Sequence, residues 1–162
     1  MSDNTSIIVR PFTYADLADV ISMDDESGND VHPWVQDLEG ENDDYNDYSW
    51  GIYVDNKLAG YCTIGYADDV WEAIKNHHLY SNNAYLLSDV YMKPEYRHHG
   101  YGLKLITETI RGRFAKQKTQ PVFLESFDKE LTNFYEKAGF EIIPNDKDEE
   151  IGCCCMVYDP NK

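Results

Sequence analysis

The stretch AYLLSDVYMKPEYRHHGYGLKLITETIRGRF, residues 84–114, decides the fold. Ala84 to Met92 is apolar and aromatic, and Pro94 has no N–H to give to a sheet, so a strand is predicted to end just before it. Apolar residues then recur at three- and four-residue steps, which indicates one buried face of a helix: Leu103, Ile106, Ile110 and Phe114. The stretch therefore predicts a strand, a turn and a helix that starts at the glycines.

The turn between them, Arg97 to Gly102, has the composition of an anion-binding loop. The first N–H groups of a helix have no intrahelical partner and attract anions where no side chain blocks the approach. Gly100 and Gly102 lack the blocking Cβ atom, and Arg97, His98 and His99 add positive charge at the same place. A phosphate or pyrophosphate is the predicted ligand. The alternative is an ordinary corner whose glycines only ease the turn.

The turn matches neither of the two common nucleotide-binding loops. The pattern G-x-x-x-x-G-K-[ST] is absent, and Gly100 and Gly102 lack the third glycine of G-x-G-x-x-G. The identity of the phosphate ligand therefore depends on the rest of the chain.

Length and charge bound the class of protein. A chain of 162 residues fits one domain with its own core, and we expect a single domain over residues 1–162. The formal charge of −16 argues against a nucleic-acid partner, since phosphate backbones need a basic surface. No long apolar run or secretion signal is present, so we expect a cytoplasmic protein without a membrane partner.

The charge is unevenly distributed. The interval from Arg10 to Lys57 has no basic residue between its ends but 13 acidic ones, whereas 7 of the 14 basic residues lie from Lys93 to Lys118. The acidic stretch, which includes Asp24, is either a solvated surface or a surface that faces a cationic substrate. It does not match a calcium-binding EF-hand loop, whose required glycine and glutamate are missing.

The remaining elements follow from periodicity and turn residues. A strand at Ile7 to Val9 precedes a capping box, Thr13-x-x-Asp16, that opens a helix. The expected buried face of that helix is Tyr14, Leu17, Ala18 and Ile21. His32-Pro33-Trp34 is interpreted as a break within the acidic region, which is expected to contain a short second helix and a loop.

The middle and the end of the chain supply the other strands. Two strands of alternating character, Ser49 to Val54 and Lys57 to Tyr66, are joined by the turn residues Asp55-Asn56. A weak helix is predicted around Trp71 to His78, and a strand from Pro121 to Phe127. The next helix is capped by Asp128, and its predicted buried face is Leu131, Phe134, Tyr135 and Ala138. The chain then forms a strand pair, Glu141 to Ile143 and Cys153 to Tyr158, around the acidic loop Asn145 to Glu150.

Cysteine and histidine spacings do not predict a metal site. Cys62 stands alone and three cysteines are consecutive at 153–155, which favours small buried strand residues in a reducing compartment. The adjacent pairs His77-His78 and His98-His99 have no partner residues in a metal-binding pattern.

Four separate segments resemble the GNAT superfamily of N-acyltransferases. Arg97-x-x-Gly100-x-Gly102 is similar to its acyl-CoA pyrophosphate loop, NFYEKAGF at residues 133–140 to its closing segment, Arg10-Pro11 with Asp16-Leu17 to its opening, and the hairpin ending in Ala59-Gly60-Tyr61 to its second and third strands. The order agrees over about residues 7 to 158. The resemblance implies an α+β fold with a mostly antiparallel mixed sheet of six to seven strands and about four flanking helices.

The resemblance also implies the chemistry and the residues that bind the donor. The family moves an acyl group, usually acetyl, from acyl-CoA to a primary amine by direct attack. Binding of acetyl-CoA as cosubstrate is carried over to the loop Arg97, His98, His99, Gly100, Tyr101 and Gly102, to the strand backbone at Val90, Tyr91 and Met92, and to Asp128. Asp128 stands where the family often has an asparagine, so it either contacts the pantetheine or only caps its helix. No metal is implied.

The implied catalytic residues are less complete. Tyr135 matches the family tyrosine that gives a proton to the departing thiolate, although its position also suits a core tyrosine. Many members have a glutamate base where this chain has Ser88, and serine cannot replace it. The candidate bases are Asp89, one residue further along the strand, and Glu125, near the end of the next strand. A base is unnecessary if the amine arrives neutral.

The acceptor is argued from charge. An acidic surface suits a cationic amine such as a polyamine or an aminoglycoside. The alternatives are a peptide or protein acceptor, acetylated at its N-terminus or at lysine, and a non-catalytic acyl-CoA sensor that has lost the base. The resemblance leaves a homodimer open.

Overall fold

The computed structural model describes residues 4–40, 48–126, 128–144 and 154–162. The chain separates into two compact units, which are described one at a time. Unit 1 comprises the described residues of 1–64 and 89–116, and unit 2 those of 65–88 and 117–162. The prediction of a single domain stays a prediction.

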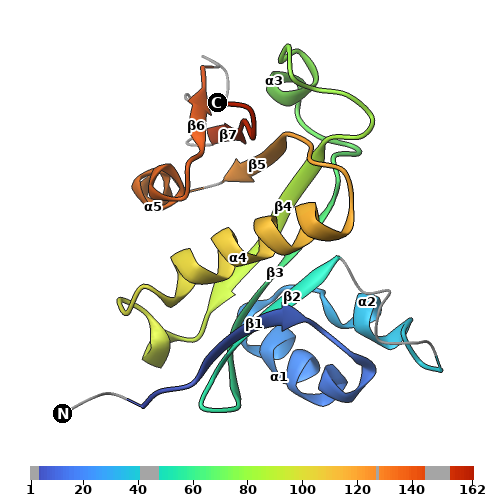
Figure 1. Ribbon diagram of the computed structural model, residues 1–162, viewed down its shortest axis with the longest axis vertical. Coiled ribbons are helices and arrows are strands. Elements are labelled where there is room, and N and C mark those ends of the chain that lie inside the picture. Colours follow the sequence, from blue (N-terminus) through green and yellow to red (C-terminus); the bar gives the residue numbers. More distant parts are fainter. Residues whose placement is uncertain (1–3, 41–47, 127, 145–153) are drawn as a thin grey trace. The chain divides into compact units, whose positions relative to one another are not determined.

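Unit 1 contains the N-terminal strands and the long helix. Its elements are β1 (Ile7–Pro11), the 3-10 turn η1 (Tyr14–Asp16), α1 (Leu17–Ser27), α2 (His32–Gln36), β2 (Ser49–Val54), most of β3 (Lys57–Tyr66), the end of β4 (Tyr85–Met92), η3 (Pro94–Tyr96) and α4 (Tyr101–Lys116). β1, β2 and β3 pair antiparallel in that order (Figure 1).

Unit 2 contains the C-terminal strands. Its further elements are α3 (Glu72–Lys75), β5 (Val122–Ser126), η4 (Lys129–Leu131), α5 (Thr132–Lys137), β6 (Glu141–Ile143) and β7 (Cys154–Tyr158). The first part of β4 pairs parallel with β5, β5 pairs antiparallel with β7, and β7 with β6. With five α-helices and seven strands in the described residues, the structure confirms the predicted α+β class and the mostly antiparallel mixed sheet.

The hairpin between β2 and β3 forms as predicted. Asp55 and Asn56 both have left-handed backbones, with φ of 50° and 67°, as a two-residue turn of the primed type requires. The predicted alternation of the two strands is wrong, because β2 is buried along its whole length and β3 along most of it. Phe12 and α1 residues pack on one side of these strands, while Trp50 of β2 contacts Gly112 of α4.

The buried face of α1 differs from the prediction. The capping box at Thr13 and Asp16 is present. Tyr14, Ala18 and Ile21 are exposed, whereas Val20 and Met23 are buried together with the two carboxylates Asp16 and Asp24, each 6% exposed. Periodicity rules count apolar residues only and ignore the two buried carboxylates, so the predicted buried face of α1 was rotated by about one residue from the observed one.

Each buried carboxylate of this face is paired. Tyr53 donates its phenol proton to Asp16 at 2.6 Å, and the Arg10 guanidinium contacts the same carboxylate through two bonds. Burial alone would raise the pKa of the Asp16 carboxyl, but the hydrogen bonds from Arg10, the Thr13 N–H and Tyr53 outweigh it, and the pKa lies below its usual value.

Three smaller expectations are corrected. His32-Pro33-Trp34 is not a break but the start of α2, with Pro33 in the first turn, where a missing N–H costs nothing. In α4 the buried residues include Leu105, Thr109 and Arg113, while Leu103 and Phe114 are only half-buried. Leu131 is 41% exposed because it ends the turn η4 and does not belong to α5.

The described cysteines lie in the environment that the sequence predicts. Cys62, Cys154 and Cys155 are buried strand residues, as expected. Cys153, the acidic loop Asn145 to Glu150 and the acidic residues from 41 to 47 lie outside the described residues. None of the described helices combines the length and hydropathy that a transmembrane span needs.

Candidate active site

The predicted anion loop follows β4 on unit 1. β4 ends at Met92, the turn η3 starts at Pro94, and α4 begins at Tyr101, so the loop leads directly into a helix of 16 residues. His98 and Gly100 have left-handed backbones, with φ of 66° and 80°. A Cβ added at Gly100 would meet no atom within 4 Å. The glycine therefore serves the backbone conformation and leaves open space in front of the first turn of α4.

Arg97 is fixed at the entrance of this loop. Its Nε donates to the Met92 carbonyl at 2.9 Å, and its guanidinium carbon lies 5.5 Å from the centre of the Tyr91 ring. The bond to Met92 uses only Nε, so the terminal nitrogens of the guanidinium remain as donors for an anion. His99 and Tyr101 flank the loop with ring centres 5.5 Å apart.

The end of β4 is closely packed against β3. A Cβ at Gly60 would lie 2.6 Å from the Tyr91 carbonyl oxygen and would also clash with the Met92 sulfur. Tyr91 donates its phenol proton to Glu26 of α1 at 2.7 Å. Val90, Tyr91 and Met92 are half-buried. Gly60 thus sets how closely the predicted pantetheine-binding backbone approaches β3.

Asp89 has an unusual backbone for a strand residue. Its φ is 55°, in the left-handed region, inside β4. Its Oδ2 accepts a hydrogen bond from the Thr63 hydroxyl of β3 at 3.0 Å. Burial raises the pKa of the Asp89 carboxyl, the Thr63 bond lowers it, and the charges of Asp24 and Asp30 raise it, with a net shift above the usual value. A carboxylate with a raised pKa is a better proton acceptor.

The other predicted site residues lie on unit 2. Glu125 of β5 accepts a hydrogen bond from the Trp71 N–H at 2.6 Å, which occupies one of its oxygens. Asp128 is exposed and caps η4, because its Oδ1 accepts from the Glu130 N–H at 2.9 Å. The pairing supports the capping alternative for Asp128.

Tyr135 is the third predicted residue of unit 2. It lies in α5 and is 7% exposed, with its ring edge-on to Phe134 and Phe140 at 5.1 and 6.0 Å. The structure thus brings Asp89, Val90 to Met92 and the loop together on unit 1, and Glu125, Asp128 and Tyr135 on unit 2.

A polar cluster around Asp24 was not predicted. Asp24 accepts from Tyr61 at 2.6 Å, from the N–H groups of Val31 and His32, and its Oδ2 lies 2.8 Å from His32 Nδ1. Burial would raise the pKa of the Asp24 carboxyl, but the bonds from Tyr61 and His32 outweigh it and the pKa is lowered. The one signal for this cluster in the sequence is that Asp24 lies only eight residues before His32, the first residue of α2.

Two arrangements have the appearance of metal-ligand sites, one within the Asp24 cluster and one on unit 2. Asp24, Asp30 and His32 place ligand atoms within 4.8 Å of one another, but both oxygens of Asp24 already accept protein hydrogen bonds. His77 and His78 follow α3 in a turn with stacked rings, 4.5 Å apart.

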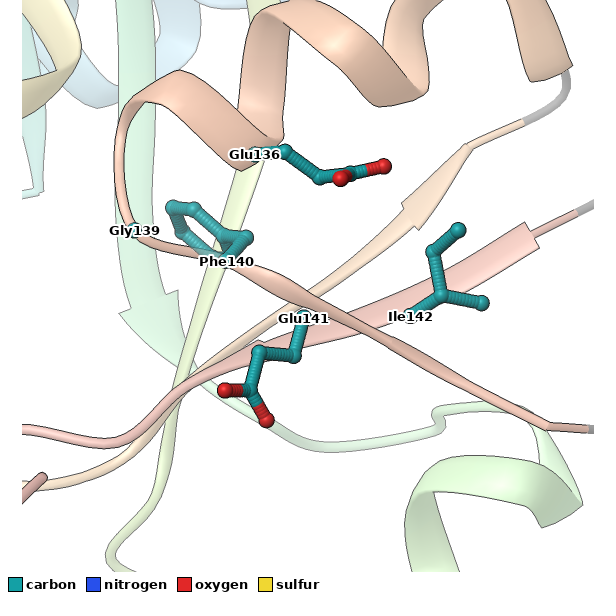
Figure 2. Close-up of a pocket in the computed structure, with 5 residues that line it drawn as sticks. All are labelled: Glu136, Gly139, Phe140, Glu141 and Ile142. Carbon is teal, nitrogen blue, oxygen red and sulfur yellow. The ribbon is translucent and has the colours of Figure 1, made fainter.

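A pocket on unit 2 contains none of the predicted site residues. It has a volume of about 500 Å³ and is lined by Glu136, Gly139, Phe140, Glu141 and Ile142. Figure 2 shows Glu141 pointing away from Ile142, as successive residues of a strand do. The pocket therefore lies at the junction of α5 and β6 and gives no support to the predicted donor site.

Comparison with known proteins identifies the family. The model of the acetyltransferase (GNAT) family matches residues 15–140, which is most of the chain. The chain therefore belongs to the GNAT acetyltransferase family, and the resemblance drawn from the sequence is confirmed. It is an acetyltransferase by family membership.

Solved structures share the fold at low identity. The PaiA N-acetyltransferase of Thermoplasma acidophilum, solved with coenzyme A, is 19% identical, with a TM-score of 0.62 over 95% of this chain and 99% of that one. NAA60 of Arabidopsis thaliana, solved with acetyl-CoA, is 13% identical, with a TM-score of 0.66 over 97% and 100%. The Bacillus subtilis N-acetyltransferase YlbP, solved with coenzyme A, is 21% identical, with a TM-score of 0.55 over 97% of both chains. No curated protein matches the chain.

Proposed function

We propose that this protein transfers the acetyl group of acetyl-CoA to a primary amine, most favourably a cationic small molecule of the polyamine or aminoglycoside type. The single observation that carries the donor assignment is the loop from Arg97 to Gly102, which presents open space at the N-terminus of a long helix. Structures that share the fold were solved with coenzyme A or acetyl-CoA, which supports the same donor.

The donor is held by three groups of residues in this proposal. Arg97, His98, His99 and the N–H groups from Gly100 to Gly102 bind the pyrophosphate, because they combine positive charge with unpaired donors. The backbone of Val90, Tyr91 and Met92 pairs with the pantetheine amides. Asp128 contributes only indirectly, since its side chain caps η4.

The reaction needs one proton acceptor and one proton donor. The amine nitrogen attacks the thioester carbonyl carbon, the new C–N bond forms, and the C–S bond breaks to release the thiolate. The bound ammonium group first gives one proton to Asp89 and becomes a nucleophilic amine; after the attack the nitrogen loses its second proton to solvent. Tyr135 gives a proton to the thiolate and regains one from solvent, so the products are an amide and a neutral thiol. We prefer Asp89 to Glu125 as the base, because the pKa of the Asp89 carboxyl is raised and Asp89 belongs to the same unit as the predicted donor loop.

The acceptor class rests on the charges near Asp89. The charges of Asp24 and Asp30 both contribute to the raised pKa of the Asp89 carboxyl, so their negative potential reaches this region of unit 1. Such a region attracts an ammonium group and repels anions. Trp34 belongs to the same unit, is 49% exposed on α2 and has its ring centre 5.5 Å from that of Tyr48, so it offers an aromatic face of the kind that cations favour.

Calorimetric titration with acetyl-CoA tests the donor site. Arg97→Ala should weaken binding by about tenfold or more, because a charge-assisted contact to phosphate is lost. Gly100→Val should also weaken it, since a branched side chain is strained at φ of 80° and fills the open space. Arg111→Ala, an exposed arginine of the same helix, is the matched control and should bind normally. Normal binding of acetyl-CoA by both loop variants would contradict the assignment of the pyrophosphate to the loop from Arg97 to Gly102.

A panel of amines tests the acceptor. Spermidine, an aminoglycoside, a lysine peptide and a peptide with a free N-terminus are compared by release of free thiol. The proposal predicts the highest kcat/KM for the polycationic small amines. A clear preference for peptides would replace the acceptor class, and tight binding of acetyl-CoA without turnover of any amine would favour a sensor.

A further inference from the structure

The contact between Thr63 and Asp89 joins a buried hydroxyl to the proposed base. Thr63 lies in β3 and is 6% exposed. Its hydroxyl donates to Asp89 Oδ2 at 3.0 Å. Both residues belong to unit 1. The sequence indicated Asp89 as a candidate base but gave no sign that Thr63 contacts it.

The backbone of Asp89 explains why such an anchor is needed. A residue other than glycine in the left-handed region inside a strand is strained, and it persists only where its surroundings hold it. Aspartate is among the residues that tolerate this conformation best. Outside β4, the left-handed aspartates of the described residues, Asp55 and Asp69, lie in turns, where no ladder has to accommodate them.

The charged and titratable groups around Asp89 come from three elements. Asp24 of α1 and Asp30 of the segment after it favour the protonated carboxyl. Cys62 of β3 has a thiol whose pKa is raised to about 12, mainly by burial, so it stays neutral near Asp89. The Thr63 hydroxyl is a donor, and a donor favours the ionised carboxylate. Thr63 therefore opposes burial and the two acids.

We propose that Thr63 is a positioning residue for the acetyl transfer, which fixes the Asp89 carboxylate on β3 and keeps it able to accept the proton of the amine. This inference rests on the proposed function, in which Asp89 is the base. Thr63 itself touches neither substrate nor cosubstrate. Its hydroxyl leaves one carboxylate oxygen, Oδ1, for the amine.

The first test follows Asp89 directly and needs no substrate. The chemical shift of the Asp89 Cγ carbon is titrated by NMR in the wild type, Thr63→Val and Thr63→Ser. Thr63→Val removes the donor with little change of volume, so the apparent pKa should rise by about one pH unit. Thr63→Ser keeps the hydroxyl and should restore the wild-type value. An unchanged titration in Thr63→Val would overturn the proposal. Thr63→Ala replaces Thr63→Val if the latter does not fold.

The second test measures the reaction. With acetyl-CoA and spermidine as substrates, kcat/KM is measured as a function of pH. The acid-side pKa of this profile should be higher in Thr63→Val than in the wild type, by the same amount as the pKa of Asp89 in the NMR titration. The calorimetric affinity for acetyl-CoA should stay normal. An acid-side pKa that does not move although the titration does would overturn the positioning role. A wild type that acetylates no amine would contradict the proposed function instead, and the NMR titration would still decide whether Thr63 holds Asp89.

Discussion

Asp89 combines strain, burial and a raised pKa in one residue. Because its pKa is raised in the folded state, the folded protein binds this proton more readily than the unfolded chain. Stability therefore falls as the pH rises through the folded pKa, and the ionised carboxylate weakens the fold at neutral pH. Groups that weaken the fold are retained where they act in chemistry.

Asp89→Asn should separate stability from activity. Asparagine tolerates the left-handed backbone and its Oδ1 can accept the Thr63 bond, so the variant should gain about 1 kcal/mol in thermal or urea unfolding at neutral pH. Its kcat/KM should fall by about 100-fold, because the base is lost. Asp55→Asn, a left-handed aspartate on the exposed hairpin, is the control and should change neither quantity. A fully active Asp89→Asn would exclude Asp89 as the base.

Tyr135→Phe tests the other proton transfer. The phenol is lost but the ring, which packs against Phe134 and Phe140, is kept, so the melting temperature should change little. We expect kcat to fall by about 100-fold, with normal affinity for acetyl-CoA, since general acid catalysis contributes on that order. Phe134→Leu controls for packing and should affect melting more than kcat. An unchanged rate across pH in Tyr135→Phe would leave Tyr135 as a core residue.

Single residues were the least predictable level from sequence. Gly100 could be predicted because glycine adopts the left-handed backbone just before a helix more readily than other residues. The bond from Thr63 to Asp89 and the cluster around Asp24 could not, since each joins residues more than 25 positions apart or depends on burial. Asp24 in particular lies in an acidic run that was interpreted as either a solvated or a substrate-facing surface, yet it is 6% exposed.

At the level of elements, the close approach of β3 to β4 depends on a glycine. Gly60→Ala should push the end of β4 away from β3, because its Cβ would clash with the Tyr91 carbonyl and with Met92. The proposal places the pantetheine on that backbone, so affinity for acetyl-CoA should fall by about tenfold in calorimetry, beyond a loss of stability of about 2 kcal/mol.

Gly51→Ala is the matched control for this effect. Gly51 lies on β2, and its added Cβ would crowd Phe12 and Leu58 and not the end of β4. The variant should therefore lose similar stability but keep its affinity for acetyl-CoA. Equal affinities in the two folded variants would contradict the assignment of the pantetheine to Val90–Met92.

Elements were predicted well where local chemistry specifies them. Asp55-Asn56 forms the hairpin turn and Pro94 follows the end of β4 with Met92 as its last residue. Helix faces were predicted poorly where polar residues are buried, as with Asp16 at the N-cap of α1, Asp24 in α1, and Thr109 and Arg113 in α4. Asp16 and Asp24 accept hydrogen bonds from tyrosines elsewhere in the fold, and the Arg113 guanidinium carbon lies 4.7 Å from the centre of the Tyr48 ring. A periodicity rule does not contain those partners.

At the level of the whole molecule, charge should govern the acceptor. The net charge of −16 predicts a stronger salt dependence for a polycationic acceptor than for a monocationic one. Raising ionic strength from about 0.01 M to about 0.1 M shortens the screening length from about 30 Å to about 10 Å. We expect kcat/KM for spermidine to fall about threefold to tenfold, measured by thiol release, and that for a monoamine such as benzylamine to fall less. Equal salt dependence would remove the argument for a polycation.

The order of elements and the family were within reach of the sequence, because motifs for the loop and for residues 133–140 occur in the expected order and the family model matches residues 15–140. The acceptor was not, since the contacts proposed for it join residues far apart in the sequence, such as Thr63 and Asp89. The division into two units was not predicted either, because β3 and β4 each contribute residues to both.

The most direct test of acetyl transfer is to incubate the wild-type protein with acetyl-CoA and spermidine and to quantify acetylated amine by mass spectrometry beside free thiol. The account predicts one acetylated amine for each thiol released, at a rate that Arg97→Ala lowers at subsaturating acetyl-CoA. Thiol release without acetylated amine, or no release from a protein that binds acetyl-CoA, would contradict it.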